Sequence, residues 1–272
     1  MSLRHAPWAE GHDFSIGLKP IAPEHWLEGG EADPTARKDA LLAAHRDLVW
    51  GETADSRAGQ AEIADLLGVA AADDQPPLLA AARTVADDLI LMEKTDGDWR
   101  VTALSLSAPT FFTAAEVLGK SLAELHGPVH GFAERFLVRV RRIFDGLRPE
   151  LILERRNWTI VNSGESFTPH SAPVRAQIPD LRTETAGRDL FIRVERQTLR
   201  RLPRTGGALF TIRVWLDPLD SLTKDPERLA AFARAWREAP ADFKAYKGFS
   251  LYAPLVEGFL RAHGETHSVN GT

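Results

Sequence analysis

The sequence of 272 residues contains no cysteine. This absence excludes a disulfide framework, a cysteine-ligated zinc site, a thiol nucleophile, a cysteine-ligated iron–sulfur cluster and a haem held by a thiolate. Any redox metal chemistry would therefore depend on histidine, tyrosine, methionine or carboxylate side chains.

Long apolar runs are missing as well. No stretch of about 18 apolar residues occurs, so we expect no transmembrane helix. The N-terminal MSLRHAPWAEGHDF lacks the apolar core of a secretory signal. A formal net charge of -5 makes the chain a poor general binder of nucleic acid. We therefore expect a cytoplasmic protein that binds neither nucleic acid nor membrane.

Several catalytic motifs are absent too. The sequence has no G-x-G-x-x-G fingerprint, no Walker A loop, no G-x-S-x-G elbow and no HExxH pair. These absences argue against a Rossmann-type dinucleotide enzyme, a P-loop NTPase, an α/β-hydrolase and a zinc hydrolase.

Apolar periodicity and turn residues predict an α+β fold. Helical spacing predicts helices over 36–50, 56–67, 77–92, 113–125, 132–147 and after Asp225. Extended runs predict strands over 99–107, 151–161, 189–202 and 208–216, the last two forming a hairpin around PRTGG. We expect a small antiparallel sheet flanked by helices. Residues 1–76 would form a helical N-terminal extension packed on the core, and residues 77–272 the main domain.

Polar residues interrupt the apolar pattern of the hairpin. Arg193, Glu195, Thr211 and Arg213 alternate with apolar positions. One interpretation is a solvated sheet face, and the other is a polar pocket floor that binds an anion such as a carboxylate or propionate. In the segment 155–158, either Arg155 with Asn157 or Arg156 with Trp158 would border a cavity or face water, because alternate strand residues face opposite sides.

Two histidines lie in LHGPVHG (125–131), between two predicted helices. His126 and His130 would act either as helix caps and packed residues or as ligands inside a cavity. Asp87 and Asp88 form either a solvated face of the third predicted helix or an acidic site. The sequence pattern alone leaves these alternatives open.

Together these segments resemble the haem-dependent oxidative N-demethylase-like family, which includes the haem subunit of dimethylamine monooxygenase. The resemblance is carried by LLAAARTVADDLILMEKTDGDWRVTA (78–103), GKSLAELHGPVHGF (119–132), RRNWTI (155–160), FIRVERQTLRRLPRTGGALFTIRVWLDPL (191–219) and AYKGF (245–249). Its most specific part is the RVERQTLRRLP…TG…FTIR block.

The resemblance implies a PAS-like fold that binds haem b, and an iron centre that activates O2 to remove a methyl group from a small secondary amine. His126 matches the family's I-H-x-P-V-P motif and is the expected axial ligand of the iron. His130 replaces the motif's second proline and becomes a second cofactor candidate. Four arginines are further candidates, as partners of the propionates or elsewhere in the cofactor site: Arg156, Arg193, Arg196 and Arg213.

Electrons for such a monooxygenase would have to come from another protein, because the chain has neither a nicotinamide fingerprint nor iron–sulfur ligands. We expect a flavin or ferredoxin-like reductase subunit as the partner. Arg200, Arg201 and Arg204 at the hairpin edge would either dock that partner or discourage edge-to-edge aggregation. The alternative function is a non-catalytic PAS-like sensor or ligand-binding protein.

Overall fold

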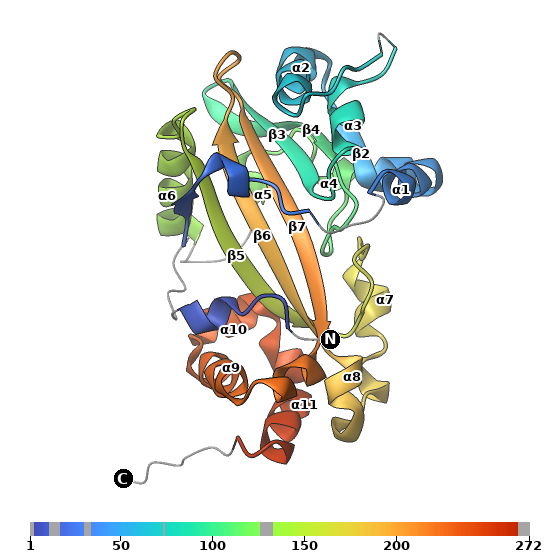
Figure 1. The fold of residues 1–272 in the computed structure, drawn as a ribbon, viewed down its shortest axis with the longest axis vertical. Coiled ribbons are helices and arrows are strands. Elements are labelled where there is room, and N and C mark those ends of the chain that lie inside the picture. The colour runs from blue at the N-terminus through green and yellow to red at the C-terminus, as the bar shows by residue number, and fades with distance from the viewer. Residues whose placement is uncertain (1–2, 11–16, 30–33, 73, 126–132, 266–272) are drawn as a thin grey trace.

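A computed structural model describes residues 3–10, 17–29, 34–72, 74–125 and 133–265. The strands of this part of the chain form one antiparallel sheet in the order β1-β5-β6-β7-β3-β4-β2 (Figure 1). Its strands are β1 (Lys19–Ile21), β2 (Trp50–Glu52), β3 (Asp88–Thr95), β4 (Asp98–Ser105), β5 (Ile152–Val161), β6 (Phe191–Arg201) and β7 (Ala208–Pro218). The predicted α+β class with an antiparallel sheet is confirmed.

The three longest strands, β5, β6 and β7, run side by side down to the level where the C-terminal helices begin (Figure 1). The β6–β7 hairpin forms as predicted, with Arg196 opposite Arg213 and Arg201 opposite Ala208. Gly206 adopts φ +75° in the connecting turn, a conformation that favours glycine. The register places Glu195 opposite Asn157 on β5, so these two side chains share one face of the sheet.

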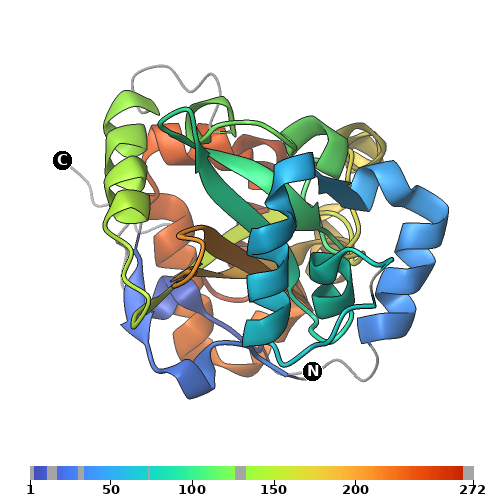
Figure 2. The ribbon, with the colours of Figure 1, turned by 90° about the horizontal axis from the view of Figure 1, so that it is seen from above.

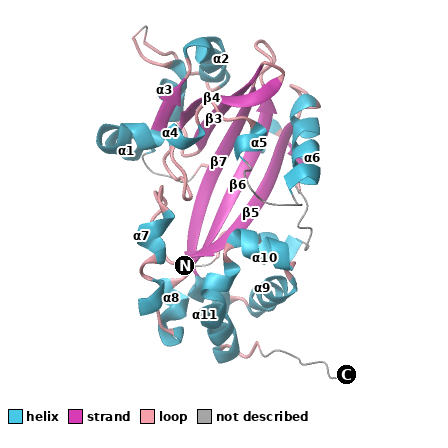
Figure 3. Ribbon diagram, turned by 180° about the vertical axis from the view of Figure 1, so that it is seen from behind, coloured by secondary structure: helices cyan, strands magenta, loops and turns pink. Residues whose placement is uncertain are grey.

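Helices cover both faces of the sheet (Figures 2 and 3). The helices of the first half are α1 (Pro34–Val49), α2 (Arg57–Leu66), α3 (Pro77–Ala82), α4 (Ala114–Val117), α5 (Leu122–Leu125) and α6 (Ala133–Asp145). Those of the second half are α7 (Ser171–Arg175), α8 (Ala186–Asp189), α9 (Pro226–Glu238), α10 (Ala241–Lys247) and α11 (Phe249–Ala262). Helix α9 starts as expected, because the Asp225 carboxylate accepts a 3.1 Å hydrogen bond from the backbone N–H of Arg228.

Two apolar clusters stabilise opposite ends of the sheet. One surrounds β3 and β4, and includes Leu78, Leu91 and Leu104. The other is rich in aromatic rings and joins β5 to the C-terminal helices. In it the ring centroids of Trp236 and Phe249 are 4.3 Å apart and stacked. The sheet and the C-terminal helices therefore share a packed core.

The prediction of a helix over 77–92 is wrong beyond Ala82. Helix α3 stops there, and residues 88–95 form β3 in the middle of the sheet. The residues Leu89 to Met92 are buried on both faces of the sheet, so apolar and polar residues do not alternate along this run. Its apolar positions therefore also match the spacing of a helical stripe. The helix predicted over 113–125 is divided into α4 and α5 around Gly119, whose φ is +78°.

The N-terminal part contributes strands to the same sheet. The short β1 pairs with β5, and β2 pairs with β4. Neither was predicted, because three-residue strands have too few positions to show a period. Within the described ranges, no helix is long and apolar enough to cross a lipid bilayer.

Candidate functional site

A cavity of about 580 Å³ lies between one face of the sheet and the helices on that side. Figure 3 shows α5 and α6 along the upper part of the long strands and α10 at their lower end. A large share of its wall is apolar. These apolar side chains come from β3, β4, β6, β7 and α4 to α6: Ile90, Met92, Val101, Val117, Leu122, Leu125, Val140, Ile143, Phe144, Leu199, Phe210 and Ile212. The cavity has the size and the apolar lining of a cofactor or small-molecule site.

The strand periodicity explains why these residues meet. Leu199, Phe210 and Ile90 lie on adjacent strands in register, so their side chains share one face. On α6, Val140, Ile143 and Phe144 follow helical spacing and face inward, as its apolar stripe predicts. The sheet and α6 thus form two facing apolar walls.

A polar network closes the end of the cavity near α10. Arg155 Nε donates a 2.6 Å hydrogen bond to Gln197 Oε1, and Gln197 Nε2 donates at 3.1 Å to Glu195 Oε2. Lys247 Nζ donates at 2.6 Å to Asn157 Oδ1, and Asn157 Nδ2 donates at 3.4 Å to the same Glu195 oxygen. All five side chains line the cavity. This end therefore presents charge and hydrogen-bonding groups, in contrast to the apolar walls.

Glu195 is held as a carboxylate in this network. Burial alone would raise its pKa, but Arg193, Lys247 and the donors Thr110 and Asn157 outweigh burial and lower it. Thr110 Oγ1 donates a 2.7 Å hydrogen bond to Glu195 Oε1. The carboxylate consequently stays ionised and accepts bonds from the protein itself.

Lys247 has an unusually acidic ammonium group. Burial lowers its pKa from 10.5 to about 8, the repulsion from Arg155 acts in the same direction, and the attraction of Glu195 opposes both. Burial also lowers the pKa of Arg155, although an arginine stays protonated. Two cations therefore share this end of the cavity.

The four arginines predicted as cofactor partners are not among the residues that line the cavity. Arg193 is on the same face of the sheet as the cavity but does not line it, and the residue is 1% exposed. Its Nη2 donates a 2.6 Å hydrogen bond to the carbonyl of Ala108. Arg193 Nε is 3.5 Å from Glu195 Oε1. The solvated-face interpretation of this residue is wrong, because the guanidinium is buried and bonded.

Arg196, Arg213 and Arg156 lie on the opposite face of the sheet. Arg196 is 1% exposed and binds Glu154 and the carbonyl of Trp26. The Arg213 guanidinium lies 4.4 Å from the ring centre of Trp215. The sequence pattern grouped Arg193 and Arg213 on one face, but the hairpin register separates them, since Arg193 is opposite Leu216.

Glu28 connects two of these arginines on that opposite face. Its carboxylate lies 3.2 Å from Arg196 Nε and 3.5 Å from Arg156 Nη2. His5 contributes most to lowering the pKa of Glu28 to about 2, followed by Arg196. The cluster ties the N-terminal segment to the sheet, and Arg156 and Arg196 already have protein counter-ions there.

Asp87 and Asp88 are buried rather than solvated, with 1% exposure each, so the solvated-helix interpretation is wrong. Asp88 accepts hydrogen bonds from the backbone N–H groups of Ser107 and Ala108 at 2.6 and 3.1 Å. The carboxylate oxygens of Asp87 receive no hydrogen bond from the described residues. Burial raises the pKa of Asp87 to about 6, although Arg213 and Lys38 attract the charged form.

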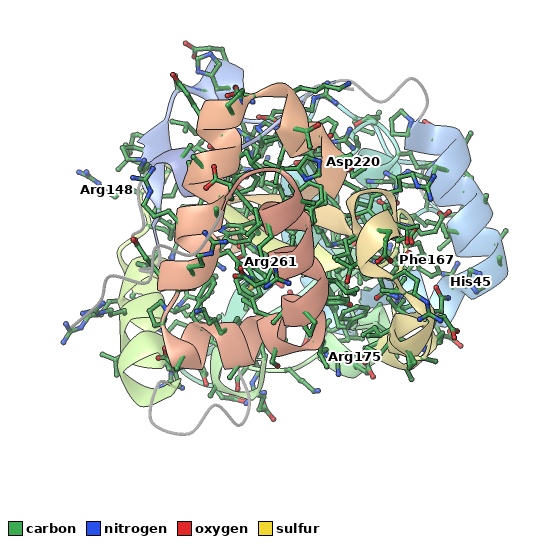
Figure 4. All side chains as sticks on the ribbon, turned by 90° about the horizontal axis from the view of Figure 1, so that it is seen from below. His45, Arg148, Phe167, Arg175, Asp220 and Arg261 are labelled. Atoms are coloured by element: carbon green, nitrogen blue, oxygen red, sulfur yellow. The ribbon has the colours of Figure 1, made fainter. Side chains whose placement is uncertain are left out.

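His126 and His130 lie outside the described residues, so their expected ligand roles stay predictions. The described histidines do not line the cavity. One of them, His45, stacks on Phe167 with ring centroids 5.3 Å apart, and both are labelled in Figure 4. The described ranges also contain no cluster of three His, Cys, Asp or Glu side chains able to hold a metal ion.

The three hairpin-edge arginines have partners within the chain. Arg200 lies over the Trp26 ring, Arg201 Nη1 donates to the carbonyl of Phe144, and Arg204 Nη2 pairs with Asp65. Each arginine therefore has a contact within the chain, and the docking of a partner stays a prediction.

Sequence reasoning overlooked Gln197 and Lys247 as site residues and left Arg155 with Asn157 as one of two choices. The strand period indicated that Arg155 and Asn157 share a face, but not which face is covered. Lys247 lies 90 positions from Asn157, and only the packing of α10 brings the two together.

One comparison with known proteins bears on this site. The family described as "Haem-dependent oxidative N-demethylase, alpha subunit-like" matches residues 52–256. The match begins at the last residue of β2, covers β3 to β7 and the helices α4 to α6 and α10, and ends within α11.

Proposed function

The chain belongs to the haem-dependent oxidative N-demethylase, alpha subunit-like family, and from this premise we propose that it binds haem b and demethylates a small secondary amine. The substrate amine, O2, two electrons and two protons would give the demethylated amine, formaldehyde and water. The electrons would come from a flavin or ferredoxin-like reductase subunit. The observation that carries the proposal is the large cavity with two apolar walls inside the family-matched region.

The residues of the cavity fit a haem. Its apolar walls suit the porphyrin faces, and its polar end suits the charged edge of the ring. Bound haem iron supplies the O2 activation that no amino-acid side chain provides. The protein's own contribution would be the apolar walls, where Phe210, Ile212 and Val140 would limit the contact of water with the reacting groups.

We propose that His126 would hold the haem iron. The chain has no cysteine, so a thiolate is excluded. Leu125 lines the cavity, and His126 is the next residue in the chain. The segment 126–132 links α5 to α6, and residues of both helices line the cavity. His130 is the second candidate, and the experiment below separates the two.

The roles of Arg156, Arg193, Arg196 and Arg213 as cofactor partners stay proposals. Each already contacts a protein carboxylate, carbonyl or ring, so binding a propionate would require exchanging that contact. Arg193 is the nearest to the cavity through its contact with Glu195. Its effect on haem would be to hold Glu195 as a carboxylate, which fixes the polar network.

The test is an absorption spectrum of the protein reconstituted with haem. Wild type should bind one haem per chain with a Soret band, and His126→Ala should lose or shift that band while His130→Ala keeps it. The reverse pattern would assign His130 as the ligand. Wild type that binds no haem would refute the proposal.

Activity separates the enzyme from the alternative sensor. Haem-loaded protein with a chemical reductant should release formaldehyde from dimethylamine only when O2 is present. Bound haem without formaldehyde release from any of a panel of small secondary amines would support a haem-binding sensor. Anaerobic samples serve as the control.

A further inference from the structure

The polar end of the cavity contains more positive than negative charge. The buried Arg193 and the partly buried Glu195 form one ion pair, with Nε and Oε1 3.5 Å apart. Arg155 and Lys247 remain, and both line the cavity. Neither forms an ion pair with a carboxylate of the described residues, because Arg155 Nε donates to Gln197 and Lys247 donates to Asn157.

Glu195 cannot serve as a full counter-ion for these two cations. Its Oε1 accepts hydrogen bonds from Thr110 and Arg193, and its Oε2 accepts from Gln197 and Asn157. The two amides Gln197 and Asn157 stand between Glu195 and the cations. Each amide accepts a hydrogen bond from a cation and donates one to Glu195, so the Glu195 carboxylate makes no direct contact with Arg155 or Lys247.

The orientation of Arg155 leaves its terminal nitrogens unused. Only Nε is bonded within the described part of the chain, at 2.6 Å to Gln197 Oε1. The two terminal nitrogens of a guanidinium form a planar fork that matches the two oxygens of a carboxylate. Both side chains are partly buried on the cavity wall, so water screens their charges less than on an open surface, and an anion in the cavity would neutralise them.

We propose that Arg155 and Lys247 form a carboxylate-binding site at the polar end of the cavity. The fork of Arg155 binds both carboxylate oxygens, and the Lys247 ammonium supplies a second contact. A small cation is disfavoured there, so a plain dimethylammonium ion would not be held by this end. This inference rests on the proposed function only in naming the two sources of the carboxylate.

One source is a propionate of the haem, and the other is an acid group on the amine substrate. In the first case this site fixes the orientation of the porphyrin. In the second it selects N-methylated amino acids over simple alkylamines. Both sources offer a carboxylate to the same two cations. If the source is the propionate, substitution of Arg155 weakens haem binding; if it is the substrate, the substitution weakens substrate binding.

The substitution is Arg155→Gln, which removes the fork and keeps a polar side chain that can still reach Gln197. The matched control is Arg148→Gln, the same change at an exposed arginine labelled in Figure 4, remote from the cavity lining. Circular dichroism and urea unfolding confirm that each variant is folded. Soret titrations then use haem and its dimethyl ester, and calorimetric titrations use N-methylglycine and dimethylamine.

A propionate site predicts that Arg155→Gln weakens haem binding about 10- to 100-fold while leaving binding of the dimethyl ester unchanged. A substrate site predicts unchanged haem binding and a similar loss of N-methylglycine binding, with dimethylamine unaffected. Arg148→Gln should change none of these. If Arg155→Gln alters neither haem nor N-methylglycine binding, the carboxylate site is refuted.

If the proposed haem-binding function is wrong, the titrations give a pattern different from failure of the carboxylate site alone. Wild type would then bind no haem, but titration of N-methylglycine into the cofactor-free protein still tests the second source. Binding that Arg155→Gln abolishes would keep the carboxylate site and reject the haem. Absence of both haem and N-methylglycine binding in wild type would overturn both proposals.

Discussion

Asp87 is a buried acid whose charge the fold tolerates poorly, and Asp87→Asn should therefore stabilise the protein at neutral pH. The side chain is 1% exposed, and its oxygens accept no hydrogen bond from the described residues. Burial raises its pKa from 3.8 to about 6, partly offset by Arg213 and Lys38. The neutral amide keeps the shape and removes the charge.

The magnitude follows from the two pKa values. The folded protein holds the Asp87 proton more tightly than the unfolded chain, so wild-type stability falls as pH rises from about 4 to above 6. At about 1.4 kcal/mol for each factor of ten in proton affinity, the full penalty is about 3 kcal/mol above pH 7. Asp87→Asn should thus gain about 3 kcal/mol at pH 8, about half of that at pH 5, and nothing near pH 3.5.

Urea unfolding followed by tryptophan fluorescence at several pH values measures this difference. The control is Asp88→Asn at the neighbouring position, where the carboxylate accepts bonds from Ser107 and Ala108. Burial raises the pKa of Asp88 as well, so Asp88→Asn also removes a buried charge, but its amide nitrogen would face a backbone N–H group. That variant should therefore gain less stability at pH 8 than Asp87→Asn. A pH-independent effect of Asp87→Asn, or destabilisation at pH 8, would refute the reasoning.

Three further predictions concern packing and the polar network. Gly258→Ala should lower stability by about 1–3 kcal/mol by overpacking against Thr183 Cγ2, and Thr183→Ser in the same chain should restore it, as measured by thermal unfolding; no rescue would contradict the clash. Glu195→Gln should cost about 3–5 kcal/mol in urea unfolding because Arg193 keeps a buried charge without its partner, and a loss below about 1 kcal/mol would argue against that pair. Lys247, which has Arg155, Glu195 and Tyr246 as its titratable neighbours, loses its charge above pH about 8. Carboxylate binding should therefore weaken between pH 7 and 9.5. Calorimetry should show that Lys247→Met removes this pH dependence, and an unchanged profile would exclude the ammonium from the site.

The hairpin and the apolar stripe of α6 were predictable from sequence because each repeats a period over many residues. Alternation predicted strands over 189–202 and 208–216, which the structure places at 191–201 and 208–218, and the inward positions of α6 follow helical spacing. The strand β3 was not predictable in this way. Its central position buries both faces, which removes the alternation that distinguishes a strand from a helix.

The site was only partly predictable for a related reason. A strand period shows which residues share a face, so Arg155 and Asn157 were paired correctly. It does not show which face a helix covers, and the arginines chosen as ligands included Arg156 and Arg196 on the opposite face. Lys247 reaches Asn157 through tertiary packing, which no local period predicts, although its segment AYKGF (245–249) is one of those that carry the family resemblance.

The central claim is that haem binds in the apolar cavity, and a matched pair of substitutions on α6 tests it most directly. Val140 lines the cavity, whereas Val138 on the same helix is 49% exposed. Tryptophan at position 140 would fill the space beside Ile143, and tryptophan at position 138 would face solvent. With both variants folded by circular dichroism, Soret titration should show haem binding lost in Val140→Trp and unchanged in Val138→Trp. Equal haem affinity in the two variants would contradict the account.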